Sequence, residues 1–289
     1  MSVPGSIPVW LAHLVDDAAI FPPGNAPLDR AVAEHAGHLA SEYAGLVGPF
    51  VVSDVKLPDL IEVVEPVETP LAVAVVVTGG AGAIEPAVRW ATRTPQLELR
   101  ALEIALRDEE DLAHNAQRVI TALDALEADL DGVTAHVEPP RVHGEPSSGW
   151  LAALDELAAR EVPLKFRTGG VEADAFPTSA ELAACLDAAL DRELPFKCTA
   201  GLHRAVRHDD PETGFRHHGF LNVLLATRAT LDGDDATAVL DETDPTHRVA
   251  EVGEEALTRT RRWFTSFGSC SILEPHEDLV ELGLMGGDR

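Results

Sequence analysis

The sequence predicts an α/β protein folded as a single (β/α)8 barrel, because short apolar runs alternate with helix-like segments along its 289 residues. Two further observations support this class. The chain is close in length to the roughly 250 residues that such a barrel takes as one domain. No linker, low-complexity tract or internal repeat divides it. We therefore expect residues 1–289 to form one domain.

The predicted strands are short apolar runs bounded by Gly, Pro or Asp. Seven are evident: Pro49–Ser53, Leu71–Thr78, Leu99–Leu106, Val133–Glu138, Pro163–Thr168, Leu194–Thr199 and Phe264–Ser271. Closing a barrel needs an eighth strand, for which we take Val9–Val15. The alternative is an open doubly wound sheet. No Gly-x-Gly-x-x-Gly motif follows an early strand, which disfavours a dinucleotide-binding version of that sheet.

Helical periodicity fills the segments between these strands. The predicted helices are Leu28–Ala44, Asp108–Leu130, Trp150–Arg160 and Thr178–Leu190. The last of these opens with Thr178 and Glu181 in the spacing of a capping box. Strands that alternate with helices in this way indicate parallel βαβ units.

A long segment, residues 201–262, separates the seventh and eighth strands of the predicted barrel. It contains a histidine-rich loop, a predicted helix at Gly219–Leu231 and an acidic stretch at Asp232–Asp244. It is too long for a simple connection between barrel strands. We expect this insertion to form a lid or a wall over the site.

The charge of the chain excludes some classes of partner. A formal net charge of -27 disfavours nucleic acids and anionic membranes, both of which need basic surfaces. No apolar run approaches the roughly 20 residues of a membrane span. Residues 1–17 carry no signal-peptide pattern. The three cysteines, Cys185, Cys198 and Cys270, fit no zinc spacing, and an odd number of them favours the reducing cytoplasm without a structural disulfide.

Lysine is scarce in this sequence. Of the 22 basic residues, only Lys56, Lys165 and Lys197 are lysines. An arginine does not lose its proton in a protein, so it cannot replace lysine as an amine nucleophile. The position of each lysine in the fold is therefore informative.

Alternation along four successive strands predicts which side chains enter the barrel. If the apolar residues face the helices, the residues left inside are Glu103, His136, Glu138, Lys165, Arg167, Lys197 and Thr199. A cluster of charges at the C-terminal ends of barrel strands is typical of an active site. The alternative is a purely structural ion-pair network, with Glu138 on Lys165 and Glu103 on Lys197.

Two charged lysines on neighbouring strands repel each other. We therefore expect the pKa of Lys165 to be lowered by Lys197 and Arg167, which would yield a neutral amine nucleophile. Such an amine can form a Schiff base with a carbonyl compound. Glu103 or Glu138 could then carry protons to and from the carbinolamine.

Two short motifs resemble those of a known family. Lys165-Phe-Arg-Thr-Gly-Gly170, followed one βα unit later by Lys197-Cys-Thr-Ala-Gly-Leu-His203, is similar to the lysine motifs of the deoxyribose-phosphate aldolases, class I aldolases on a (β/α)8 barrel. The resemblance covers roughly residues 99–203. It implies that Lys165 forms the Schiff base, that Lys197 lowers its pKa, and that Glu103 and Glu138 are the acidic partners. Phe166, Arg167 and Ala200 depart from the family's pattern, and the insertion has no counterpart in it.

Other residues are candidates for binding. Arg167, Thr199, His136 and His203 are the expected substrate contacts inside or beside the barrel. Ser269 and Ser271, in the small-residue segment 266–271, could present backbone N–H groups to an anion. The segment 16–24, which begins with Asp16 and Asp17, is interpreted as a turn, with the two acids lining the site as the alternative. Lys56 and Cys270 are secondary candidates.

The sequence is compatible with three functions. The first is a carbon–carbon lyase that uses a Lys165 imine on a small carbonyl or phosphorylated substrate, with no cofactor. The second is a metal-dependent hydrolase or isomerase with Glu138, His203 and His208 as ligands, although histidines of the insertion match no zinc signature. The third is a non-catalytic barrel that binds a small anion through Lys165, Arg167 and Lys197. The sequence leaves open whether the chain forms a homo-oligomer.

Overall fold

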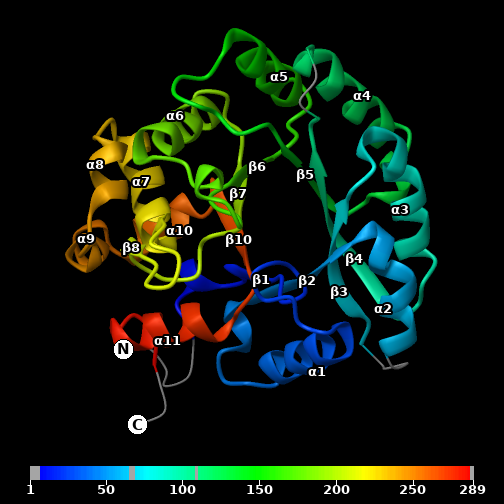
Figure 1. Cartoon of the computed structure of the whole chain (residues 1–289), viewed down its shortest axis with the longest axis horizontal. Helices are drawn as coiled ribbons and strands as arrows, with labels where there is room; N and C mark the ends of the chain where they lie inside the picture. Colours follow the sequence, from blue (N-terminus) through cyan, green and yellow to red (C-terminus); the bar gives the residue numbers. More distant parts are fainter. Residues whose placement is uncertain (1–6, 65–68, 108–109, 287–289) are drawn as a thin grey trace.

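The computed structural model of this chain describes residues 7–64, 69–107 and 110–286. Eight parallel strands close into a barrel in the order β1-β10-β7-β6-β5-β4-β3-β2, and helices surround it (Figure 1). The predicted (β/α)8 barrel is therefore confirmed, and the open-sheet alternative is wrong. The barrel strands are β1 Val15–Asp17, β2 Val47–Ser53, β3 Leu71–Val77, β4 Leu97–Ala105, β5 Thr134–Glu138, β6 Leu164–Arg167, β7 Phe196–Thr199 and β10 Phe264–Ser269.

Among the described residues, one α-helix follows each of the strands β1–β6 and β10, and four further α-helices lie in the insertion between β7 and β10. They are α1 Leu28–Leu39, α2 Leu57–Val63, α3 Ile84–Thr92, α4 Leu112–Asp124, α5 Ser148–Ala158, α6 Ser179–Leu190, α7 Phe220–Asp232, α8 Ala236–Asp241, α9 Thr246–Val252, α10 Glu254–Thr260 and α11 Leu273–Glu281. Helix α6 begins with the predicted capping box, in which Thr178 and Glu181 each bond to the other's backbone N–H. No helix in the described part of the chain is long and apolar enough to cross a membrane.

The predicted strand at Val9–Val15 is wrong in all but its last residue. Val9–Leu11 forms a turn of 3-10 helix after Pro8, and β1 begins only at Val15. His13 has a φ of +49°, in the left-handed region that an extended strand cannot contain. This displacement moves the strand toward the two acids, so that Asp16 and Asp17 belong to β1 itself.

Several helix boundaries also differ from the prediction. The helix predicted at Leu28–Ala44 ends at Leu39. The helix predicted at Asp108–Leu130 spans Leu112–Asp124 and is capped by Asp111, while residues 108–109 lie outside the described ranges. The acidic stretch at 232–244 contains α8, whose N-cap is Asp235. At the starts of α4 and α8 the helix boundary is set by a capping aspartate rather than by apolar periodicity.

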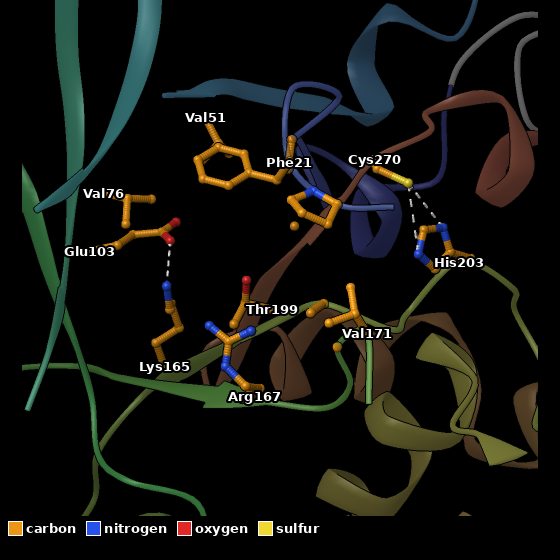
Figure 2. Close-up of a pocket in the computed structure, with 15 residues that line it drawn as sticks. Phe21, Val51, Val76, Glu103, Lys165, Arg167, Val171, Thr199, His203 and Cys270 are labelled. Carbon is orange, nitrogen blue, oxygen red and sulfur yellow. Dashed lines mark hydrogen bonds and ion pairs between the residues drawn. The ribbon is translucent and has the colours of Figure 1, made fainter. Parts of the chain in front are cut away.

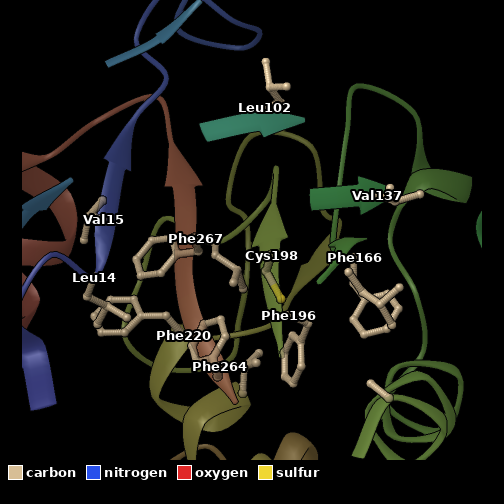
Figure 3. Close-up of a cluster of buried hydrophobic side chains, with 14 of the residues drawn as sticks. Leu14, Val15, Leu102, Val137, Phe166, Phe196, Cys198, Phe220, Phe264 and Phe267 are labelled. Carbon is tan, nitrogen blue, oxygen red and sulfur yellow. The ribbon is translucent and has the colours of Figure 1, made fainter. Parts of the chain in front are cut away.

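An aromatic layer fills the space between the barrel and the helices. The ring of Phe196 on β7 lies 5.4 Å from that of Phe166 on β6 and 5.6 Å from that of Phe264 on β10, measured between centroids (Figure 3). Trp150 of α5 stacks on Phe166 at 6.5 Å. The apolar residues of these strands therefore face the helices, as alternation predicted, and the polar residues between them are turned into the barrel.

The insertion between β7 and β10 packs against the barrel through α7. Phe220 of α7 stacks on Phe267 of β10 with centroids 5.0 Å apart. A small antiparallel hairpin, β8 His208–Asp209 and β9 Arg216–His217, precedes α7. Asn222 of α7 is fully buried and holds three backbone groups of the insertion. Its Oδ1 accepts from the N–H of Arg207 at 2.9 Å, and its Nδ2 donates to the carbonyls of Val239 and Glu242 at 2.9 and 2.8 Å.

Replacing Asn222 with alanine should lower the free energy of unfolding by about 2–4 kcal/mol, because it leaves buried backbone groups without partners. Urea unfolding followed by circular dichroism would measure the loss. Thr227→Val is the matched control on the same helix, because the Thr227 hydroxyl bonds only to the Val223 carbonyl of its own helix. It should cost less than about 1 kcal/mol. Equal losses in both variants would contradict the anchoring role of Asn222.

Candidate active site

Two lysines lie side by side inside the barrel. Lys165 on β6 and Lys197 on β7 are direct neighbours in the register of the two strands. They are almost fully buried, with 3% and 1% of their surfaces exposed. Buried ammonium groups are stable only when carboxylates or other acceptors compensate them.

Glu103 on β4 compensates both lysines at once. Its Oε2 accepts from the Lys165 Nζ at 2.8 Å, and its Oε1 accepts from the Lys197 Nζ. Lys197 also donates to Asp16 of β1, whose Oδ2 accepts from the Ser266 hydroxyl at 2.9 Å. The interpretation of Asp16 as a turn residue is therefore wrong, because it belongs to β1 and is buried inside the barrel.

Glu138 on β5 extends the network toward the solvent. Its Oε2 lies 2.8 Å from the Lys165 Nζ, and its Oε1 accepts from the Arg167 Nε at 2.8 Å. The carboxylates and cations thus alternate in one chain: Asp16, Lys197, Glu103, Lys165, Glu138 and Arg167. When all six are ionised, three positive charges balance three negative charges. Arg167 is the outermost member, and its side chain is 44% exposed.

The predicted lowering of the Lys165 pKa is wrong. Burial favours the neutral amine, but Glu103 and Glu138 outweigh burial and hold the pKa of Lys165 above its ordinary value. The pKa of Lys197 is raised in the same way by Asp16 and Glu103 against the effect of burial. The reason is distance, because the carboxylates contact the amines directly whereas the two lysines are separated by Glu103.

The same contacts act on the acids of the network. Burial opposes ionisation of Glu103, but its two lysine partners hold its pKa well below the usual range. Lys165 and Arg167 likewise lower the pKa of Glu138 against burial. Asp16 differs, because burial outweighs Lys197 and raises its pKa. Of the three acids, Asp16 therefore binds a proton most readily.

His136 of β5 also points into this network, as predicted. It is buried, and its Nδ1 has no hydrogen-bond partner among the residues that the structure describes. Burial, followed by the charge of Lys197, lowers the pKa of His136 to about 3. At neutral pH it is therefore a neutral imidazole. His136 lines neither of the two cavities described in the next paragraphs.

A cavity of about 260 Å³ opens above the network at the C-terminal ends of the strands (Figure 2). Lys165, Glu103, Arg167 and Thr199 form its polar wall, and Lys197 does not reach it. The remaining lining residues are Ala18, Phe21, Pro22, Val51, Val76, Gly170, Val171, Ala200, His203, Gly268 and Cys270. Lys165 is thus the lysine with access to a small molecule.

A second chamber of about 730 Å³ adjoins this cavity, and we call it the outer chamber. The two share Pro22, Gly170, Val171, Ala200, His203 and Cys270 as lining residues. The insertion supplies much of the outer wall, including His208, Asp210, Phe215 and His217. The insertion therefore forms a wall of the site.

The glycines of the two lysine motifs allow the loops after β6 and β7 to approach each other. Gly201 has a φ of +78°, and a Cβ on it would lie 2.9 Å from both the Gly169 Cα and the Thr168 carbonyl oxygen. The Thr168 N–H also donates to the Thr199 carbonyl at 2.9 Å. A side chain at Gly201 would push these loops apart, and both loops line the cavity.

Some predicted site residues lie elsewhere. Ser269 bonds with Ser271 in its own turn and lines neither chamber, whereas Ser271 lines the outer chamber. Lys56 is exposed and pairs with Asp59 at 2.9 Å, away from the cavity. Cys185 and Cys198 are buried free thiols on the helix-facing side.

The ligands of the alternative metal site have separate partners. Glu138 contacts Lys165 and Arg167, whereas the Nδ1 of His203 lies 3.0 Å from Glu274 and that of His208 lies 3.1 Å from the Val206 carbonyl. Within residues 7–64, 69–107 and 110–286, no three His, Cys, Asp or Glu side chains are grouped so that they could hold a metal ion.

Comparisons with known proteins do not assign this chain to a family. No protein-family model matches it, and no curated protein matches it.

Replacing Glu103 with glutamine should lower the free energy of unfolding by about 3–5 kcal/mol, because two buried ammonium groups lose a charged partner. Denaturant titration at pH 7 measures this loss. Glu98→Gln is the matched control on the same strand, since Glu98 pairs with Arg100 at 2.8 Å on the surface. That variant should change stability by less than about 1 kcal/mol. A similar small change in Glu103→Gln would show that the network does not depend on Glu103.

His136 should make stability depend on pH. In the unfolded chain a histidine titrates near 6.5, whereas the pKa of His136 in the folded chain is about 3. The unfolded state therefore binds the extra proton first, and stability falls as pH falls from 6.5 toward 3. Between pH 7 and pH 4, wild type should lose roughly 3 kcal/mol more than His136→Gln. His114→Gln, at an exposed position, is the control, and curves for wild type and His136→Gln that run parallel would refute the effect.

Proposed function

We propose that this chain is an enzyme in which the Lys165 amine forms an imine with a small aldehyde or ketone and so makes or breaks the neighbouring carbon–carbon bond. The observation that carries the proposal is the difference between the two lysines. Lys165 lines the cavity, and Lys197 is buried beneath it behind Glu103. Active sites of (β/α)8 barrels lie at this end of the strands. The resemblance to deoxyribose-phosphate aldolases points to the same lysine.

The raised pKa of Lys165 requires a proton acceptor before the amine can attack. Glu103 and Glu138 both lie 2.8 Å from the Nζ, within direct hydrogen-bond distance. Glu103 also lines the cavity. In this mechanism the carboxylates take one proton from the ammonium group before the N–C bond forms and a second from the nitrogen afterwards. Both protons pass to the former carbonyl oxygen, which leaves as water and leaves a protonated imine.

The protonated imine accepts electrons in the carbon–carbon step. When the bond between the α- and β-carbons breaks, its electron pair forms the double bond of an enamine, the β-hydroxyl gives its proton to a carboxylate of the site, and the β-carbon leaves as an aldehyde. Lys197 stays charged below the site and keeps Glu103 ionised through their direct contact. It therefore acts as a positioning residue for Glu103 rather than as the nucleophile.

The cavity favours a small substrate with an uncharged carbonyl end. Its volume of about 260 Å³ is below that of typical drug-sized sites. Lys165, Arg167 and His203 line it, and each already contacts a carboxylate, so the inner site has no surplus positive charge for an anion. This pairing argues against the non-catalytic anion-binding alternative. The outer chamber has room for the rest of a longer substrate.

Borohydride reduction tests the imine directly. The protein is incubated with a panel of small aldehydes and ketones, reduced, digested and mapped by mass spectrometry. With only three lysines in the chain, each adduct is assigned without ambiguity. We expect a stable adduct on Lys165, none at position 165 in Lys165→Arg, and slower trapping in Lys197→Arg. Arginine keeps the positive charge beside the buried acids but forms no imine.

Lys56→Arg is the matched control for this experiment, because Lys56 is an exposed lysine outside the site. Its trapping on Lys165 should equal that of wild type. An adduct distributed evenly over the accessible amines, with none favoured at Lys165, would contradict the proposal. Tight binding of inorganic phosphate without any adduct would instead favour the anion-binding alternative.

A further inference from the structure

A thiol, an imidazole and a carboxylate meet where the two chambers join. Cys270 follows β10, His203 follows β7, and Glu274 lies in the first turn of α11. The Cys270 Sγ is 3.7 Å from the His203 Nδ1 and 3.9 Å from its Nε2 (Figure 2). The Glu274 Oε2 lies 3.0 Å from the same Nδ1.

The carboxylate orients the imidazole and favours its charged form. Because Nδ1 is paired with Glu274, Nε2, which lies 3.9 Å from the Sγ, is the ring nitrogen that can exchange a proton with the sulfur. Burial favours neutral His203, but Cys270 and Glu274 outweigh it and raise the pKa of His203 to about 9. The other charged or titratable groups that line the outer chamber with the imidazole are Arg204, which pairs with Asp278, and His208, Asp210, Glu212 and His217 of the hairpin region.

The other two cysteines lack this environment. Cys185 and Cys198 are buried in the apolar layer, and burial raises the pKa of Cys185 to about 12 and that of Cys198 further. Cys270 is only partly buried and lines both chambers. A protonated histidine beside an accessible cysteine is the arrangement that generates thiolate nucleophiles in proteins.

We propose that Cys270 is a second nucleophile of this site, which captures small aldehydes reversibly as hemithioacetals with His203 as the proton donor. The Sγ forms a bond to the carbonyl carbon, the carbonyl π bond breaks, and the oxygen takes the proton of the His203 imidazolium. The reverse steps release the aldehyde, and no oxidant or reductant is needed. Glu274 is the positioning residue for the imidazole.

The aldehyde as ligand rests on the proposed function, whereas the nucleophilic thiol does not. Cys270 and Lys165 line the same cavity, so a carbonyl compound that enters to reach the amine also meets the sulfur. Val171 and Thr199 lie between them in the lining (Figure 2). The two nucleophiles therefore select from the same class of small molecule.

Alkylation by iodoacetamide at pH 7, followed by mass mapping of the three cysteines, tests the thiol. Cys270 should react at least tenfold faster than Cys185 and Cys198 in the folded protein. His203→Asn should slow the reaction of Cys270 at least tenfold. Glu274→Gln should slow it severalfold, and Glu274→Asp should recover part of the rate. Equal rates in wild type and His203→Asn, with folding intact by circular dichroism, would overturn the proposal.

Protection by acetaldehyde tests the ligand class, and Lys165→Arg separates it from imine chemistry. In Lys165→Arg, acetaldehyde should still slow alkylation of Cys270 at least threefold, and dilution should restore the rate. Protection that is present in wild type and absent in Lys165→Arg would overturn aldehyde capture at Cys270 while supporting the imine. Failure of borohydride trapping with protection retained would overturn the proposed function alone.

Discussion

The contact of one carboxylate, Glu103, with two buried ammonium groups is the interaction on which the site depends. Charged groups enter a barrel interior only when partners replace the water that they lose. Glu103 meets that requirement for Lys165 and Lys197 together, and Asp16 and Glu138 complete the balance on either side. Because these five residues come from β1, β4, β5, β6 and β7, the network also ties strands across the interior of the barrel.

The inward faces of the strands could be predicted because they depend on local alternation alone. Phe166 and Phe196, the apolar residues next to Lys165 and Lys197 along their strands, face the helices, and the amines therefore face the interior. The role of Asp16 could not be predicted in this way. It contacts Lys197 across 181 positions of sequence, and β1 is too short to show a periodic pattern. The direction of the pKa shift of Lys165 was predicted wrongly for a related reason, since it depends on which charges lie nearest in space.

The scarcity of lysine pointed to the site, but it does not by itself assign function. Lys56 was also retained, and it forms only an exposed pair with Asp59. What distinguishes Lys165 is the combination of burial, two carboxylates at 2.8 Å and a cavity at its amine. An arginine there could satisfy the charges but could not form an imine. A structural network alone has no need of the cavity, so access to a small molecule is the feature that favours chemistry over simple charge balance.

The outer chamber shows which part of the site could be predicted only in outline: the insertion was expected to form a wall, but its individual contacts were not. Its wall comes from the insertion, where the hairpin of β8 and β9 places His208 against His217 and the loop after β7 brings His203 to Glu274. No periodic pattern in the sequence indicates that these segments meet, and His203 and Glu274 are distant in the sequence. Histidine enrichment marked the region, and His203 was expected beside the barrel, but its contacts with a carboxylate and a thiol could not be predicted. The barrel strands thus determine where the amine lies, and the insertion determines what else a bound carbonyl compound meets.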